Sequence, residues 1–129
     1  MSWNKYILDS SALLAVAYRE VGAEKAQALI DRSVLSSVNL AECISVAVLK
    51  GVPADQALAN FLYMVPTVIP FDQQIALIAG KMIAHTHPFG LSLGDRACLA
   101  TALHLNLEIV TADKIWSKLD LQTKIRLIR

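Results

Sequence analysis

Short apolar runs alternate with longer segments of helical periodicity along the chain. Buried strands are predicted at residues 5–8, 34–37, 67–69 and 108–110, with a further edge strand at 123–128. Helices are predicted at residues 12–18, 23–31, 38–49, 54–63, 73–84 and 93–105, with a short one after Asp113. His85 to Gly90 is predicted to be a loop, because Pro and Gly interrupt the pattern. This alternation predicts a parallel sheet with helices on both faces.

Length, composition and net charge limit the classes of protein to which the chain can belong. Residues 1–129 fit one domain without a linker or repeat. The apolar fraction of 55% suits a sheet covered on both faces, and an apolar patch for a protein partner would also raise it. A net charge of +1 gives no global basic field, so any RNA contact must be local.

The cysteines and histidines show no pattern that indicates a disulfide or a metal motif. Cys43 and Cys98 lie in apolar helical runs, which is typical of reduced core residues. The three histidines, His85, His87 and His104, lack the spacing of a metal motif. We see no signal peptide and no membrane span, so a cytoplasmic protein is expected.

Two aspartates follow predicted strands directly. Asp9 comes after the first strand and Asp113 lies just beyond the fourth, with Thr111 nearby to orient a carboxylate or a water molecule. Ligands of open α/β sheets bind outside the carboxyl ends of the strands, so both side chains are candidates for a shared site. Helix capping is the plainer interpretation of each.

Two further acids lie on predicted helices. Glu42 shares a narrow polar stripe with Asn39 and Ser45 on an otherwise apolar helix, which indicates either a site or a solvated face. Asp95 lies in the first turn of its helix, where it could simply complement the helix dipole. Carboxylates gathered in one cleft repel one another and normally persist around a divalent cation. The four acids together therefore predict a metal-dependent enzyme.

These acids lie in four ordered motifs: residues 7–14 (ILDSSALL), 40–42 (LAE), 93–100 (LGDRACLA) and 110–113 (VTAD). The set resembles PIN-domain ribonucleases, particularly VapC-type toxins, over nearly the whole chain. The resemblance implies an α/β PIN fold with a parallel sheet of four or five strands in the order 3-2-1-4-5. It also implies an endoribonuclease that uses Mg²⁺ or Mn²⁺, bound by residues Asp9, Glu42, Asp95 and Asp113.

Other roles are expected from the same motifs. Ser10 or Ser11, Asn39 and Thr111 would support the acids, while Arg96 and Lys114 would contact RNA phosphates. The resemblance further implies a cognate VapB-like antitoxin that holds the toxin inactive, and a homodimer formed through the apolar helices between residues 23 and 63. Exposed basic residues beside an acidic site often have no specific role, and this is the plainer interpretation of Arg96 and Lys114.

Two alternatives stay open at the level of sequence. A receiver-like or phosphatase-like protein could form an aspartyl phosphate at a magnesium site, since Asp72 also follows a strand, but a second acid beside Asp9 is missing. A non-catalytic PIN-like module could bind RNA or protein without cleaving, although the complete acidic set argues against decay of the site. Motifs for dinucleotides, P-loops and hydrolase elbows are absent from the chain.

Overall fold

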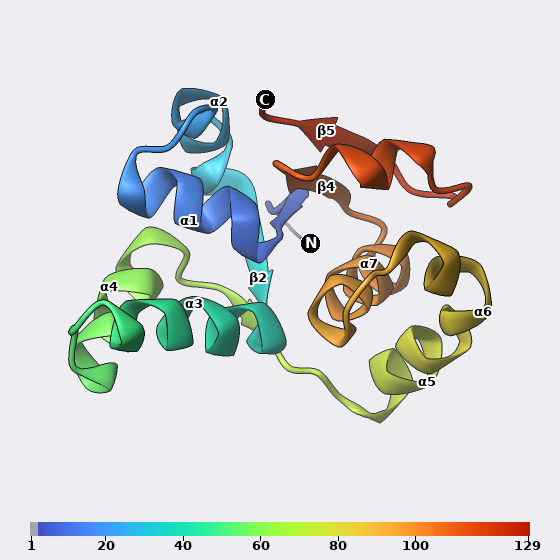
Figure 1. The fold of residues 1–129 in the computed structure, drawn as a ribbon, viewed down its shortest axis with the longest axis horizontal. Coiled ribbons are helices and arrows are strands. Elements are labelled where there is room, and N and C mark those ends of the chain that lie inside the picture. The colour runs from blue at the N-terminus through green and yellow to red at the C-terminus, as the bar shows by residue number, and fades with distance from the viewer. Residues whose placement is uncertain (1–2) are drawn as a thin grey trace.

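A five-stranded parallel sheet forms the centre of the computed structural model, which describes residues 3–129 (Figure 1). The strands are β1 (Tyr6–Leu8), β2 (Ser33–Ser36), β3 (Val68–Ile69), β4 (Glu108–Thr111) and β5 (Ile125–Leu127). Their order is β3-β2-β1-β4-β5, and all four pairings are parallel. The predicted α/β class and the 3-2-1-4-5 order are therefore confirmed. This order differs from the 2-1-3-4-5 order of receiver-like folds, which argues against that alternative.

Helices cover both faces of the sheet. They are α1 (Ser10–Tyr18), α2 (Ala23–Gln27), α3 (Ser37–Leu49), α4 (Ala54–Met64), α5 (Gln73–Lys81), α6 (Ile83–Thr86) and α7 (Leu93–Leu105). Single 3₁₀ turns follow at η1 (Ile30–Arg32), η2 (His87–Phe89) and η3 (Lys114–Lys118). None of the helices in residues 3–129 has the length and apolar character needed to cross a membrane.

Two apolar layers hold the helices on the sheet. Because strand side chains alternate between faces, Ile7 and Leu8 of β1 enter different layers. Leu8 packs with Leu13 and Phe61 under α1 to α4, whereas Ile7 packs with Trp116 under α5 and α7. In Figure 1 these two groups of helices lie on opposite sides of the sheet. Cys43 and Cys98 are buried free thiols in these layers, as predicted.

Two predicted segments differ from the structure. Residues 85–90 do not form the predicted loop, because α6 continues into η2. The Thr86 hydroxyl donates back to the Met82 carbonyl at 2.9 Å. Pro88 lies in the first turn of η2, where it needs no N–H partner. The predicted helix 23–31 ends at Gln27 and tightens into η1, where the Ser33 hydroxyl donates to the Leu29 carbonyl at 2.8 Å. Both changes shorten the connection to the next packed element.

Candidate active site at the carboxyl edge of the sheet

Asp9 is buried at the centre of the carboxyl edge. β1 delivers it there, and its N–H donates to the Val110 carbonyl of β4 at 3.1 Å. The carboxylate caps α1 by accepting from the Ala12 N–H at 2.9 Å, and it also accepts from the hydroxyls of Ser11 and Thr111, both at 2.7 Å. Only 4% of the residue is exposed. The capping interpretation is thus correct, and it leaves the carboxylate fixed in place rather than free to turn.

Burial makes ionisation of Asp9 costly. Removal from water raises the pKa of this carboxyl from 3.8 to about 6, even though the three hydrogen bonds act to lower it. The negative charge of Asp95 raises the pKa further. A cation close to Asp9 would offset both effects, because an opposite charge favours the ionised form.

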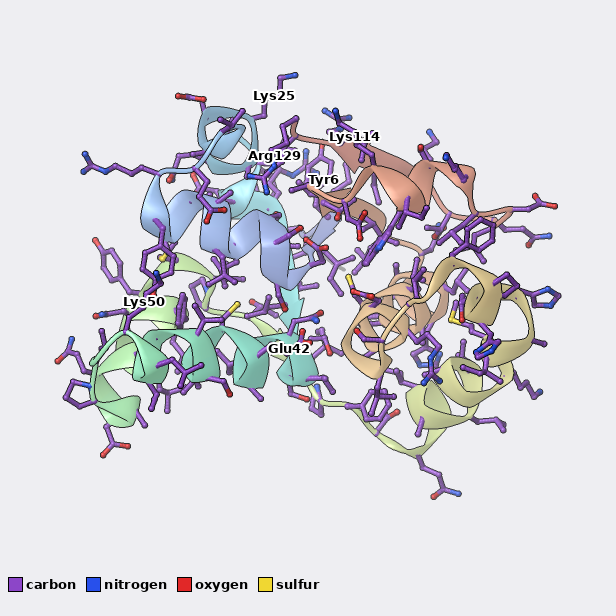
Figure 2. The ribbon with its side chains drawn as sticks, viewed as in Figure 1. Tyr6, Lys25, Glu42, Lys50, Lys114 and Arg129 are labelled. Atoms are coloured by element: carbon purple, nitrogen blue, oxygen red, sulfur yellow. The ribbon has the colours of Figure 1, made fainter. Side chains whose placement is uncertain are left out.

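Glu42 joins three helices at the same edge (Figure 2). Its Oε1 accepts a hydrogen bond from the Ser10 hydroxyl of α1 at 2.5 Å and another from Asn39 Nδ2, one turn earlier in α3, at 2.8 Å. Asn39 Nδ2 also donates to the Gly94 carbonyl of α7 at 3.1 Å. Oε2 of Glu42 accepts no hydrogen bond within residues 3–129 and is free for another partner.

Gly94 is a functional position that sequence reasoning missed. A Cβ atom added there would overlap the carboxylate of Glu42, because α7 and α3 approach closely at this point. Gly is otherwise unfavourable inside a helix by about 1 kcal/mol relative to Ala. A Gly directly before Asp95 in a helical pattern was the available signal, but only the tertiary arrangement identifies the side chain that needs the space.

Asp95 is the electrostatic centre of the acidic group. It forms a capping box with Ser92, in which Oδ2 accepts from the Ser92 N–H at 2.9 Å, so Oδ1 keeps its lone pairs. Burial raises the pKa of Asp95, and the charges of Glu42 and Asp113 raise it further. Asp9 feels Asp95 in the same way. Each of the other three acids is therefore close enough to Asp95 to repel it.

Asp113 is the exposed member of the group. It caps η3 by accepting from the Ile115 N–H at 3.1 Å through Oδ1. Its own N–H donates to the hydroxyl of Thr111 at 3.0 Å, and that hydroxyl donates in turn to Asp9. Ser11 completes the link, since its hydroxyl accepts from the Ala112 N–H at 3.0 Å while it donates to Asp9. Thr111 and Ser11 thus connect the ends of β1 and β4.

Buried Cys98 lies within the electrostatic influence of three of the acids. Burial raises the pKa of this thiol well above 9, and the charges of Asp9, Asp95 and Glu42 add to the effect. One buried atom of α7 therefore senses acids from three separate elements. The sequence-predicted acids lie at the same edge of the sheet, close enough for their charges to affect one another.

The acidic group contains the kind of ligand that a divalent cation needs. All four side chains offer carboxylate oxygens, the ligands that Mg²⁺ and Mn²⁺ prefer, and Glu42, Asp95 and Asp113 each keep one oxygen without a hydrogen bond from residues 3–129. As the side chains lie, no three Asp, Glu, His or Cys groups of these residues are close enough to hold a metal ion. The residues fit a cation by type and by free lone pairs, and the acids would have to move closer together to bind one.

Ser45, Arg96 and Asp72 make their hydrogen bonds outside the acidic group. Ser45 is exposed and donates to the Ala41 carbonyl, so the polar stripe of α3 leaves the site after Glu42. Arg96 donates from Nη1 to the Ala79 carbonyl of α5 at 2.9 Å, which gives it a packing role; its contact with RNA stays a prediction. Asp72 caps α5 through the Ile75 N–H and takes no part in the acidic group.

The fold and the acidic edge define a class of α/β protein in which a 3-2-1-4-5 sheet presents carboxylates where its strands end. A family model described as PIN domain matches residues 6–121. The chain belongs to the PIN domain family. None of the curated proteins with which the chain was compared matches it.

Several solved structures that resemble the chain are VapBC or other toxin-antitoxin complexes. DNA-bound VapBC from Salmonella typhimurium matches at 21% identity over 98% of this chain and 99% of that chain, with a TM-score of 0.74. A toxin-antitoxin complex from Klebsiella pneumoniae matches at 20% identity over 97% and 98%, also at 0.74. VapBC2 from Rickettsia felis, bound to a promoter fragment, matches at 18% identity over 95% and 97%, at 0.72. At these identities the likeness shows a shared fold.

Proposed function

We propose that the protein is a metal-dependent endoribonuclease and the toxin of a toxin-antitoxin pair. The observation that carries the proposal is the gathering of Asp9, Glu42, Asp95 and Asp113 around one edge of a PIN fold, with Asp95 repelled by all of the others. Such a cluster is unfavourable unless a cation neutralises it. The toxin role is supported by the folds of the VapBC complexes.

The four acids would hold Mg²⁺ or Mn²⁺. When bound, such an ion supplies an activated water for attack on a phosphodiester and stabilises the charge that develops on the phosphate oxygens. The hydroxyls of Thr111 and Ser11 hold the Asp9 carboxylate in one orientation, and those bonds favour its ionised form. The hydroxyls of Ser10 and Ser11 donate to Glu42 and Asp9 and serve to hold these carboxylates in place, so hydrolysis by water is the chemistry that suits the site.

Glu42 is oriented by a separate pair of donors. Ser10 and Asn39 both bind Oε1, which directs Oε2 away from them and leaves it free. Because Asn39 is also bonded to the Gly94 carbonyl, the orientation of Glu42 depends on how α3 packs against α7. Residues that orient metal ligands in this way typically contribute 10- to 100-fold to metal affinity or activity.

The partner proteins belong to the same proposal. Antitoxin binding is proposed because the similar structures are VapBC or toxin-antitoxin complexes. A homodimer through the segment 23–63 is proposed as well, and exposed apolar side chains such as Leu49 and Tyr63, both 89% exposed, give that segment surface to bury. A dimer measured by light scattering that dissociates when Tyr63 is replaced by Asp would support this surface.

Metal dependence is the first experimental test. Purified protein, freed of antitoxin and treated with chelator, is expected to leave an RNA oligonucleotide intact. Addition of Mg²⁺ or Mn²⁺ should restore cleavage, whereas Ca²⁺, which is larger and accepts other geometries, should restore much less. Cleavage that continues undiminished with excess chelator would contradict the proposal.

A further inference from the structure

A hollow of about 980 Å³ opens beside the acidic edge. It is lined by the turn after α1, the segment after β4 and the last residue: Glu20, Val21, Ala112, Asp113, Lys114 and Arg129. Asp113 belongs both to this hollow and to the acidic group. Its size is at the upper end of the range of pockets that hold small ligands, about 300 to 1,000 Å³. The hollow therefore places binding space directly next to the proposed cleavage site.

Val21 gives the hollow an apolar wall that is both exposed and fixed. It is 76% exposed, and the turn that carries it is held on both sides. Arg19 and Gly22 have positive φ angles of 55° and 95°, and a Cβ at Gly22 would overlap the Ile128 carbonyl. Arg129 Nη1 donates to the Val21 carbonyl at 2.9 Å. A rigid turn that presents an apolar side chain to solvent does nothing for the core and suits contact with a ligand.

Two cations lie on the other walls. Lys114 is exposed and forms no ion pair within residues 3–129, and Figure 2 shows it near Arg129 at the same end of the molecule. Arg129 is 3.6 Å from Glu20, an exposed pair that is worth little in water. The negative charge of Glu20 is thus compensated by Arg129, and the negative charge of Asp113 would be compensated by a bound cation. The charge of Lys114 then remains for an anionic ligand.

We propose that this hollow holds the nucleotide next to the scissile phosphodiester of the RNA. Lys114 contacts the phosphate of that nucleotide, and Val21 packs against its ribose or base. The inference rests on the proposed function, because Asp113 joins the hollow to the metal site. An unpaired nucleotide fits, since a base held in a duplex could not turn toward an apolar wall.

Binding of an RNA oligonucleotide to Asp9→Asn protein tests this subsite without cleavage. Fluorescence anisotropy over a series of salt concentrations should show that Lys114→Ala reduces the slope of log affinity against log salt by about 0.7, the change for one phosphate contact on a single strand. Val21→Asp should weaken binding about tenfold or more. Val21→Ala, which is less disruptive, should weaken it less but measurably.

Matched controls use residues far from the hollow. Lys81 and Leu77 are exposed on α5, outside both the hollow and the proposed dimer segment, so Lys81→Ala and Leu77→Asp should leave RNA affinity unchanged. RNA binding with an unchanged salt slope for Lys114→Ala and unchanged affinity for both Val21 variants would overturn the subsite while leaving the nuclease standing. If the wild-type protein cleaves no RNA and the Asp9→Asn protein binds none, both proposals fail.

Discussion

Replacement of Asp9 by Asn is expected to reduce RNA cleavage more than 100-fold and to leave the fold intact. The effect should exceed the 10- to 100-fold loss that is typical when only a residue supporting a metal ligand is removed, because the substitution removes a charged ligand itself. The amide can still accept from the Ala12 N–H and cap α1, since Asn and Asp are about equally good N-caps. Initial rates with saturating Mg²⁺ measure the loss.

Asp72 supplies the matched control for this variant. It caps α5 through the Ile75 N–H just as Asp9 caps α1, but it lies outside the acidic group. Asp72→Asn is therefore expected to keep wild-type cleavage. Equal losses in the two variants would mean that capping, and not metal binding, explains the effect at Asp9.

The stability of the metal-free Asp9→Asn protein provides a second readout that does not depend on activity. The Asp9 carboxyl titrates near 3.8 when unfolded and near 6 when folded, so the folded wild type binds more protons between these values. The stability that the Asp9 carboxyl contributes to the folded wild type is therefore fully present below pH 3.8 and is lost as the pH rises through 6. Above pH 6, Asp9→Asn should be more stable than wild type by up to about 3 kcal/mol. Urea unfolding at several pH values measures the difference, which should shrink toward pH 4.

Replacement of Gly94 by Ala is expected to cost about 10- to 100-fold in cleavage, although Ala is the better helix former. The added methyl group would occupy the space of the Glu42 carboxylate, which must then move away from Ser10 and Asn39. Crowding of this kind also costs about 1 to 3 kcal/mol of stability. Steady-state cleavage and urea unfolding of the same variant measure both effects.

Gly80 of α5 distinguishes this crowding from a general effect of the substitution. A Cβ at Gly80 meets nothing within 4 Å, so Gly80→Ala should keep full activity and gain about 0.5 to 1 kcal/mol of stability. Shortening the acid in the double variant Gly94→Ala, Glu42→Asp should make room and recover part of the activity relative to Gly94→Ala alone. A Gly94→Ala protein as active as the wild type would show that the contact between α7 and α3 does not orient Glu42.

Much of the fold follows from local patterns. The strand-helix alternation predicts the parallel sheet, and the capping interpretation of Asp9 and Asp113 holds, since they begin α1 and η3. Strand ends likewise indicate Asp9 and Asp113, because the carboxyl ends of parallel strands meet at one edge. The helical conformation of residues 85–89 was not predicted, because Pro88 and Gly90 indicated a loop, although the Thr86 hydroxyl bonds to the Met82 carbonyl only four residues earlier.

The contacts within the site depend on packing that sequence does not encode locally. Glu42 and Ser45 share a polar stripe, but α3 leaves the carboxyl edge between them and only Glu42 stays. Arg96 follows Asp95 directly, yet one step along a helix turns the side chain toward α5. The need for Gly at position 94 arises from the approach of α3, more than 50 residues away in the chain.

The central claim is that four acids from distant parts of the chain close around one cation. A crystal structure of the full chain with millimolar Mn²⁺, examined by anomalous scattering, tests it most directly. The account predicts one or two Mn²⁺ ions at the carboxyl edge of the sheet, bound by oxygens of at least three of the residues Asp9, Glu42, Asp95 and Asp113. A structure in which Mn²⁺ binds elsewhere, with these carboxylates free of metal, would contradict it.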